Sequence, residues 1–116
     1  MIKKITKIKL NGENLISLDN LRKLVGNNKH LYTVHAQEQM AVRKVYDKEI
    51  KEIILGAKAE IIEEYPEDKY SPSCLIYGKT LQGRILHVQA NYQALIITVY
   101  EPNSKKWQED FKRRKK

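Results

Sequence analysis

The chain has 116 residues, which fits one domain and leaves no room for two. It carries 22 Lys and Arg against 14 Asp and Glu, for a net charge of +8, and 41% of its residues are apolar, as in ordinary globular proteins. Its one cysteine, Cys74, excludes an internal disulfide and a cysteine-rich metal site, and no apolar run approaches the roughly 20 residues that cross a bilayer. No signal-peptide pattern follows the basic start and no phosphate-binding glycine loop is present, so we expect a cytoplasmic protein without a metal, a cofactor or a membrane partner.

The positive charge is concentrated at the two ends. Residues 1–30 and residues 105–116 each carry seven Lys and Arg against two acids, a net charge of +5, whereas residues 31–104 carry −2. Such ends bind phosphate backbones or an acidic protein, or they are solvated tails that aid solubility.

The first half of the chain has the periodicity of helices. Residues 2–10 mix Ile and Lys and predict an arm or a short strand, followed by a turn at Asn11-Gly12. Three apolar stripes with helical spacing follow capping residues. The predicted helices run over 18–25 between the N-cap Ser17 and Gly26, over 35–44 after Thr33, and from a cap at Asp47 to Gly56.

The second half has the pattern of strands separated by turns, and the predicted strands are 59–65, 73–80, 83–91 and 94–101. Their short connections predict an antiparallel meander. Pro102-Asn103-Ser104 then predicts a last helix with Trp107 and Phe111 on one side. The predicted fold is α+β, with N-terminal helices packed on one face of about four antiparallel strands and a C-terminal helix. We divide the chain into a basic arm with a short helix, 1–30, and a single domain, 31–116.

The last two strands predict which residues share a face. If Tyr92-Gln93 is the loop, Val88 lies opposite Ile97 and Leu86 opposite Val99, on the face that the helices cover. The other face, which we expect to be open, then carries His87 opposite Thr98, with Tyr100 diagonal to both.

A series of short motifs carries a resemblance to a known family. The motifs are Thr33-Val34-His35-Ala36-Gln37-Glu38-Gln39-Met40-Ala41-Val42-Arg43, Gly56, Glu60-Ile61-Ile62-Glu63-Glu64-Tyr65, Ser73-Cys74-Leu75, Gly83-Arg84-Ile85-Leu86-His87-Val88, Ile97-Thr98-Val99-Tyr100-Glu101-Pro102, Trp107 and Phe111-Lys112-Arg113-Arg114-Lys115. Over about residues 31–115 the chain resembles a bacterial family catalogued as domain of unknown function 4258.

That family in turn resembles small toxins of toxin–antitoxin modules with a RelE-like or barnase-like ribonuclease architecture. The resemblance implies RNA as substrate, a cognate antitoxin as partner, and metal-independent cleavage in which a ribose 2′-OH attacks the adjacent phosphate. One position departs from the family pattern, because Gln39 stands where an Arg usually precedes the Met of the helix. If that Arg contacts phosphate in relatives, this chain binds phosphate more weakly there.

Transesterification of a phosphodiester needs a base, an acid and cations for the phosphate. The candidate acid–base residues are His35, His87 and Tyr100, since histidine titrates near neutral pH. Each also has a purely structural interpretation: His35 as a residue that caps or packs at a helix start, His87 as a half-buried sheet histidine bonded to Thr98, and Tyr100 as a cover for apolar surface. His30 lies in a polar, Asn-rich stretch and is set aside.

The candidate phosphate or RNA ligands are Arg43, Arg84, Thr98 and Arg113, because the guanidinium fork can bind a phosphate through two hydrogen bonds. His35, Gln39 and Arg43 form a stripe on one side of the predicted helix. Arg113 is equally well explained as a surface charge.

Two other groups are given structural roles. Cys74 is expected to pack, and the acids at 63–64 and 67–68 to form a solvated edge with no metal. Two functional alternatives to the ribonuclease remain open: a non-catalytic nucleic-acid-binding module, and a protein-interaction partner such as a toxin neutraliser.

Overall fold

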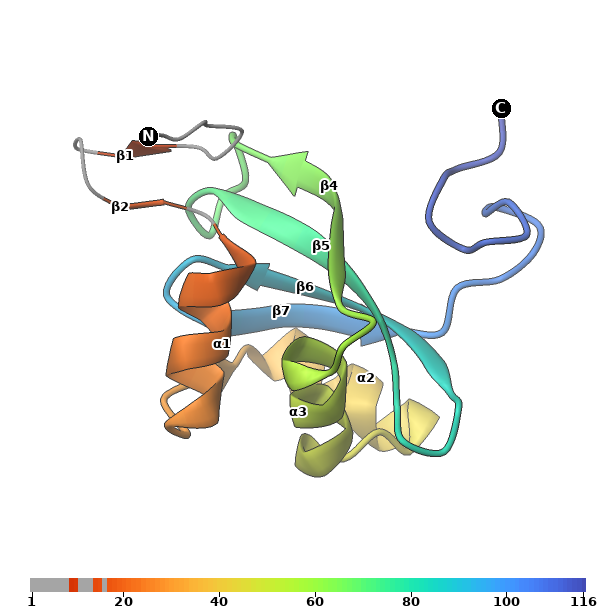
Figure 1. Ribbon diagram of the computed structural model, residues 1–116, viewed down its shortest axis with the longest axis horizontal. Coiled ribbons are helices and arrows are strands. Elements are labelled where there is room, and N and C mark those ends of the chain that lie inside the picture. Colours follow the sequence, from red (N-terminus) through yellow and green to blue (C-terminus); the bar gives the residue numbers. More distant parts are fainter. Residues whose placement is uncertain (1–8, 11–13, 16) are drawn as a thin grey trace.

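The computed structural model describes residues 9–10, 14–15 and 17–116, and its fold is α+β. Within these residues three helices gather on one side of a five-stranded sheet (Figure 1). A separate pair of two-residue strands, β1 (Lys9–Leu10) and β2 (Asn14–Leu15), is antiparallel. The start of the predicted arm and the predicted turn at Asn11-Gly12 lie outside the described residues. No helix in the described part of the chain is long and apolar enough to cross a membrane.

The three helices begin close to where capping residues predict them. They are α1 (Leu18–Gly26), α2 (Val34–Arg43) and α3 (Asp47–Leu55). The Ser17 hydroxyl accepts the Asn20 N–H at 3.2 Å and the Thr33 hydroxyl accepts the Ala36 N–H at 2.9 Å, so both predicted N-caps are confirmed. The third cap is one residue off: Tyr46 is the N-cap of α3, and its N–H donates to the Glu49 carboxylate at 3.1 Å.

The sheet has the strand order β3-β7-β6-β5-β4. The four predicted strands are confirmed as β4 (Glu60–Tyr65), β5 (Ser73–Lys79), β6 (Ile85–Asn91) and β7 (Leu95–Tyr100), and neighbouring members of this set pair antiparallel. The prediction of an all-antiparallel sheet is wrong, because β3 (Leu31–Tyr32) adds a fifth strand that runs parallel to β7.

The register of β6 and β7 differs from the predicted one by two residues. Val88 pairs with Val99 and His87 with Tyr100, where Ile97 and Thr98 were expected. A shift of two leaves Val88, Val99, His87 and Tyr100 on their predicted faces, because the side-chain period of a strand is two. Farther along, a bulge pairs Ala90 with Ile96, so Ile96 and not Ile97 joins the core.

The core lies between the helices and the sheet face that they cover. Its buried members come from every layer: Leu21 and Val25 of α1, Ile50, Ile53 and Ile54 of α3, Cys74 and Ile76 of β5, Leu86 and Val88 of β6, and Ile96 and Val99 of β7. The predicted packing of Cys74 is thus confirmed. We call the opposite side of the sheet the front face; it carries Tyr77, His87, Gln89, Thr98 and Tyr100.

The prediction of a C-terminal helix is wrong. Residues 102–116, here the C-terminal segment, form an irregular loop closed by an antiparallel bridge between Trp107 and Arg114. The Asn103 side chain accepts the N–H groups of Lys105 and Lys106, and Phe111 adopts a φ of 58°. These local hydrogen bonds compete with helix formation. The Trp107 side chain is nevertheless buried.

Candidate functional site

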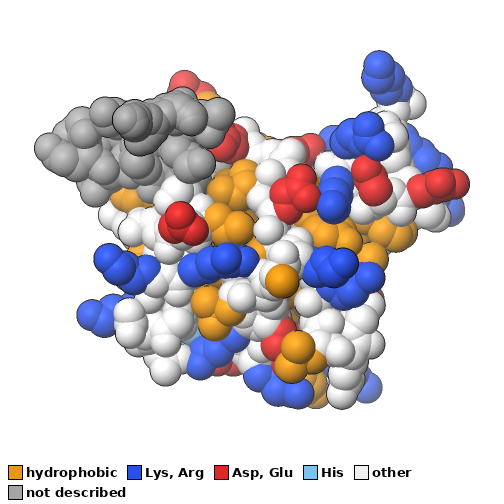
Figure 2. Space-filling view, in the orientation of Figure 1, with side chains coloured by type: hydrophobic (Ala, Val, Ile, Leu, Met, Phe, Trp, Pro, Cys, Tyr) orange, Lys and Arg blue, Asp and Glu red, His pale blue; other side chains and the backbone are white. Residues whose placement is uncertain are grey.

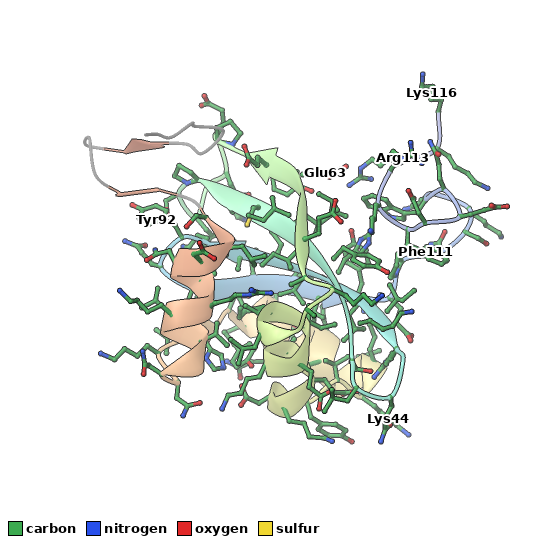
Figure 3. The ribbon with its side chains drawn as sticks, in the orientation of Figure 1. Lys44, Glu63, Tyr92, Phe111, Arg113 and Lys116 are labelled. Atoms are coloured by element: carbon green, nitrogen blue, oxygen red, sulfur yellow. The ribbon has the colours of Figure 1, made fainter. Side chains whose placement is uncertain are left out.

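The C-terminal segment covers the part of the front face that contains His87. The Trp107 ring packs edge-on against the His87 ring, with 4.4 Å between centroids, and His87 is 0% exposed. The expectation that His87 lines an open face is therefore wrong. Figure 3 shows Glu63 of β4 facing the segment that carries Phe111 and Arg113.

Two hydrogen bonds define the proton arrangement of His87. Its Nε2 lies 2.6 Å from the Phe111 carbonyl oxygen, which only accepts, so Nε2 carries a hydrogen. Its Nδ1 lies 3.2 Å from the Tyr100 hydroxyl. Burial lowers the pKa of His87, although the bond to Phe111 opposes this, and in the resulting neutral ring Nδ1 is an acceptor. Tyr100 therefore donates its hydroxyl hydrogen to His87.

Tyr100 itself is partly exposed and lines a groove of about 300 Å³. We call it the Tyr100 groove, and it is lined by Arg43, Tyr100, Glu101, Asn103, Lys106, Trp107 and Arg114. It contains three cationic side chains against one carboxylate. Burial raises the pKa of Tyr100, with Arg114 opposing, so the phenol keeps its proton at neutral pH.

The three cations of the groove differ in how they are paired. Within the described residues, neither Arg43 nor Lys106 forms an ion pair with a carboxylate, so both charges are available to an anion. Arg114 contacts Glu63 through two hydrogen bonds of 2.7 and 3.1 Å and lies 4.5 Å above the Trp107 ring. In Figure 2 the Lys and Arg side chains of the C-terminal segment gather at the upper right, with acidic side chains between them.

Helix α2 lies along β7 because it is tied to that strand at both ends. At its start the Thr33 hydroxyl donates to the Ile97 carbonyl at 3.0 Å. At its end the Arg84 guanidinium donates to the carbonyls of Arg43 and Lys44 at 2.7 and 3.0 Å and to Glu101 at 2.9 Å. The predicted stripe of His35, Gln39 and Arg43 therefore runs beside β7, and Arg43 donates to Gln39 within it.

Two of the predicted phosphate ligands are placed away from an open anion site. Arg84 uses its guanidinium inside the fold, where Glu101 raises its pKa and Glu49 lies 3.5 Å away. The Arg113 side chain is 72% exposed, pairs with Asp110 at 3.1 Å, and does not line the Tyr100 groove.

His35 and Thr98 line a second depression, of about 440 Å³, which we call the Thr98 hollow. Its other lining residues are Asp68, Lys69, Tyr70, Gln89 and Ile97. A third depression, of about 630 Å³, shares Asp68 and Gln89 with this hollow and Arg114 with the Tyr100 groove. The structure thus brings Arg43 together with Tyr100, and His35 together with Thr98, on one continuous surface.

The surroundings of Cys74 and Glu63 determine their protonation. Among the described residues no three His, Cys, Asp or Glu side chains are placed to hold a metal ion. Burial raises the pKa of Cys74 to about 12, which leaves it a thiol. Burial also acts to raise the pKa of Glu63, but the hydrogen bonds from Arg114 and Tyr65 outweigh it and hold that pKa below its usual value.

His30, set aside on sequence grounds, belongs to a structural cluster. Its Nε2 lies 2.7 Å from the Asp47 carboxylate, which also accepts from the Tyr32 hydroxyl, and the His30 side chain is 4% exposed. The cluster ties β3 to the start of α3. It lies outside the front face.

Sequence reasoning missed five groove residues, of which three are charged, namely Glu101, Lys106 and Arg114. The last two were assigned to a helix, and the only signal that marked them was the basic character of residues 105–116.

Comparison with known proteins gives one match. A family model described as a domain of unknown function (DUF4258) matches residues 32–101, which run from β3 through β7 and contain Arg43, His87 and Tyr100. No curated protein and no solved structure matches the chain.

Proposed function

This chain belongs to the family described as a domain of unknown function (DUF4258), and from its own site we propose that it is a toxin-like ribonuclease that cleaves RNA without a metal. The observation that carries the proposal is the Tyr100 phenol, which is bonded to a buried neutral histidine in a groove that gathers Arg43, Lys106 and Arg114. The proposed partners are RNA and, on the resemblance to toxin modules, a cognate antitoxin.

The cations of the groove suit a phosphodiester. Arg43 and Lys106 have no carboxylate partner in the described part of the chain, and Arg114 is held rigidly by Glu63 and Trp107. Preorganised donors around a phosphate stabilise the negative charge that grows on its oxygens in the transition state. Arginine adds a planar fork that matches two phosphate oxygens.

The proposed reaction transfers the phosphoryl group within the RNA. The ribose 2′ oxygen loses its proton and attacks the phosphorus, while the bond to the 5′ oxygen of the next nucleotide breaks and that oxygen takes up a proton. The Tyr100 oxygen accepts the 2′ proton while its own phenol hydrogen passes along the existing hydrogen bond to His87 Nδ1. Lys106, which lines the same groove, donates a proton to the leaving oxygen.

His87 acts behind Tyr100 and does not touch the RNA in this proposal. Its Nδ1 orients the phenol and takes up its hydrogen, so His87 acts through Tyr100 as a positioning residue and not as the direct acid or base expected from the sequence. Protonation of Nδ1 would remove the acceptor. Activity should therefore fall as the pH drops through the lowered pKa of His87, and His87→Gln should lose that acidic limb of the profile along with most of kcat.

The test is incubation of the purified protein with RNA in a chelator and analysis for 2′,3′-cyclic phosphate ends. We expect cleavage by the wild type and a loss of 10²- to 10⁴-fold in Tyr100→Phe, because general acid–base catalysis is worth about that factor. The matched control is Arg113→Gln, which changes a basic residue outside the groove and should cut like the wild type. Absence of cyclic phosphate with the wild type, or equal cleavage by Tyr100→Phe, refutes the proposal.

A non-catalytic RNA-binding module is the second candidate, and the structure gives it one specific support. His87 is fully buried and His35 lines a different depression, so the two histidines do not form an acid–base pair across one site. This candidate predicts RNA that stays intact while it binds with an affinity that falls steeply as salt is raised.

A further inference from the structure

The Thr98 hollow lies one nucleotide step from the Tyr100 groove. Thr98 and Tyr100 pair regularly with Gln89 and His87, so both side chains stand on the front face, about 6.6 Å apart along β7. On the neighbouring helix, His35 and Arg43 are separated by eight residues, or about 12 Å. A strand of RNA with a phosphate at Tyr100 therefore reaches the hollow with an adjacent base.

Aromatic and apolar side chains line the hollow. Tyr70 and His35 bring two rings to it, and the nearly buried Ile97 brings apolar surface. Lys69 stands 5.2 Å over the Tyr70 ring, where its charge can meet a neighbouring phosphate. Unpaired RNA bases are bound in this way, by stacking on aromatic side chains beside a basic surface.

Two polar groups of the hollow, Asp68 and Gln89, are fixed as acceptors by their hydrogen bonds, whereas Lys69, Tyr70 and Thr98 can donate. The Gln89 amide nitrogen donates to Asp68 Oδ1 at 3.3 Å and to the Ser73 hydroxyl at 3.0 Å, which leaves its Oε1 as an acceptor. Asp68 Oδ2 accepts the Tyr70 N–H at 2.9 Å, so the carboxylate is held in place, and an ionised carboxylate cannot donate. An exocyclic amino group has two N–H donors and can therefore bind both acceptors at once.

We propose that the Thr98 hollow is a nucleobase subsite that selects bases with an exocyclic amino group and discriminates against uracil. Cytosine, adenine and guanine each present an amino group with two N–H donors, whereas uracil has a carbonyl oxygen where cytosine has its amino group and offers only its single N3–H. Asp68 and Gln89 would accept from the amino group while Tyr70 and His35 stack on the ring. This inference rests on RNA being the ligand of the Tyr100 groove.

The sharpest comparison is between cytosine and uracil, which have the same shape. Short RNAs that differ only in one such base should be cleaved next to cytosine about tenfold or more faster than next to uracil. The same strands made uncleavable by a 2′-deoxy sugar should show a similar ratio in Kd, measured by fluorescence anisotropy. Equal cleavage at both bases overturns the subsite but supports the ribonuclease. Selective binding without cleavage supports the subsite but refutes the ribonuclease.

Two variants separate hydrogen bonding from stacking. Asp68→Asn replaces an acceptor by a group that can also donate, and should bring the cytosine-to-uracil ratio close to one. Tyr70→Ala should weaken binding of both strands about tenfold and leave their ratio unchanged. Glu109→Gln removes a carboxylate elsewhere on the C-terminal segment and is the matched control. A wild-type ratio in Asp68→Asn, with cleavage intact, contradicts the proposal.

Discussion

At the scale of single residues, the partners of a side chain decide its role more than its type does. Arg43, Arg84 and Arg113 were all expected to hold phosphate. Arg43 alone of the three lines the Tyr100 groove, while Arg84 joins α2, α3 and β7, and Arg113 faces solvent. Arg84 therefore positions Arg43 and Glu101 without itself lining the groove.

Replacing Arg84 by Gln should destabilise the fold by about 1–3 kcal/mol. The change removes charge-assisted hydrogen bonds and leaves two backbone carbonyls with a weaker partner, and the partial exposure of the pair with Glu101 limits the cost. Arg113→Gln, in contrast, should leave the denaturation midpoint unchanged because Arg113 is largely exposed. Urea unfolding followed by circular dichroism measures the stability of both variants. An Arg84→Gln variant as stable as the wild type would contradict the proposal that Arg84 holds α2 to Glu101.

At the scale of elements, Gly78 sets the distance between α3 and β5. A Cβ built on Gly78 would lie 2.6 Å from Ile53 Cγ2 and 2.9 Å from the Ile53 carbonyl oxygen, so any side chain there would push the helix off the sheet. The glycine lies on the helix-covered face opposite Leu86. It allows the close contact that buries Ile53 and Ile54.

Gly78→Ala should cost about 1–3 kcal/mol of the free energy of unfolding, since overpacking forces a backbone shift. The matched control is Gly26→Ala in α1, where the nearest atom to a new Cβ is Leu55 Cδ2 at 3.9 Å, an ordinary contact. That control should be neutral or slightly stabilising, because alanine is the better helix former. Similar loss of stability in both variants would mean that the Gly78 contact is not the cause.

The elements also show where sequence reasoning succeeds and where it stops. Apolar periodicity and capping residues predicted three helices and four strands, because both signals are local. The loop after Asn91 was taken as two residues, but Ala94 adopts a φ of 65° and extends it to three. Three-residue hairpin loops commonly end in such a left-handed residue, and the usual signal, a glycine, is absent here.

The helix predicted for the C-terminal segment is wrong for a different reason. Its residues have partners far away in sequence: Lys112 pairs with Glu60 at 3.0 Å, Arg114 with Glu63, and Phe111 accepts from His87. A helical interpretation uses only neighbouring residues and cannot detect them. For the same reason the front-face location of Tyr100 and Thr98 was predictable, since it follows from strand alternation, whereas the cations that complete the groove were not.

At the scale of the whole molecule, the Tyr100 groove lies at a junction between two parts of the chain. Arg43, Tyr100 and Glu101 come from residues 32–101, where the family model matches, whereas Lys106, Trp107 and Arg114 come from the C-terminal segment. The charge follows the same division, because residues 105–116 carry a net +5 on a body that is close to neutral. The proposed site therefore depends on the segment staying docked.

Docking of the C-terminal segment should weaken in acid, before the rest of the fold is lost. Beneath it lie His87, which is neutral and 0% exposed, and Glu63, which is ionised and paired with Arg114. The pKa of each lies below its ordinary value, 6.5 for the histidine and 4.5 for the carboxyl. A group with a lowered pKa stabilises the fold above its ordinary value, and this contribution is lost as the pH falls through the folded-state pKa.

The single tryptophan, Trp107, reports this loss directly. As the pH falls below about 6.5, its emission should shift to the red while the far-ultraviolet circular dichroism of helices and sheet stays constant, and each unit of lowered pKa corresponds to about 1.4 kcal/mol. In His87→Gln, which cannot take up a proton, the shift should begin only where Glu63 is protonated, below about pH 4.5. Fluorescence and circular dichroism that change together in the wild type would show that the segment and the core unfold as one unit, and would contradict the prediction.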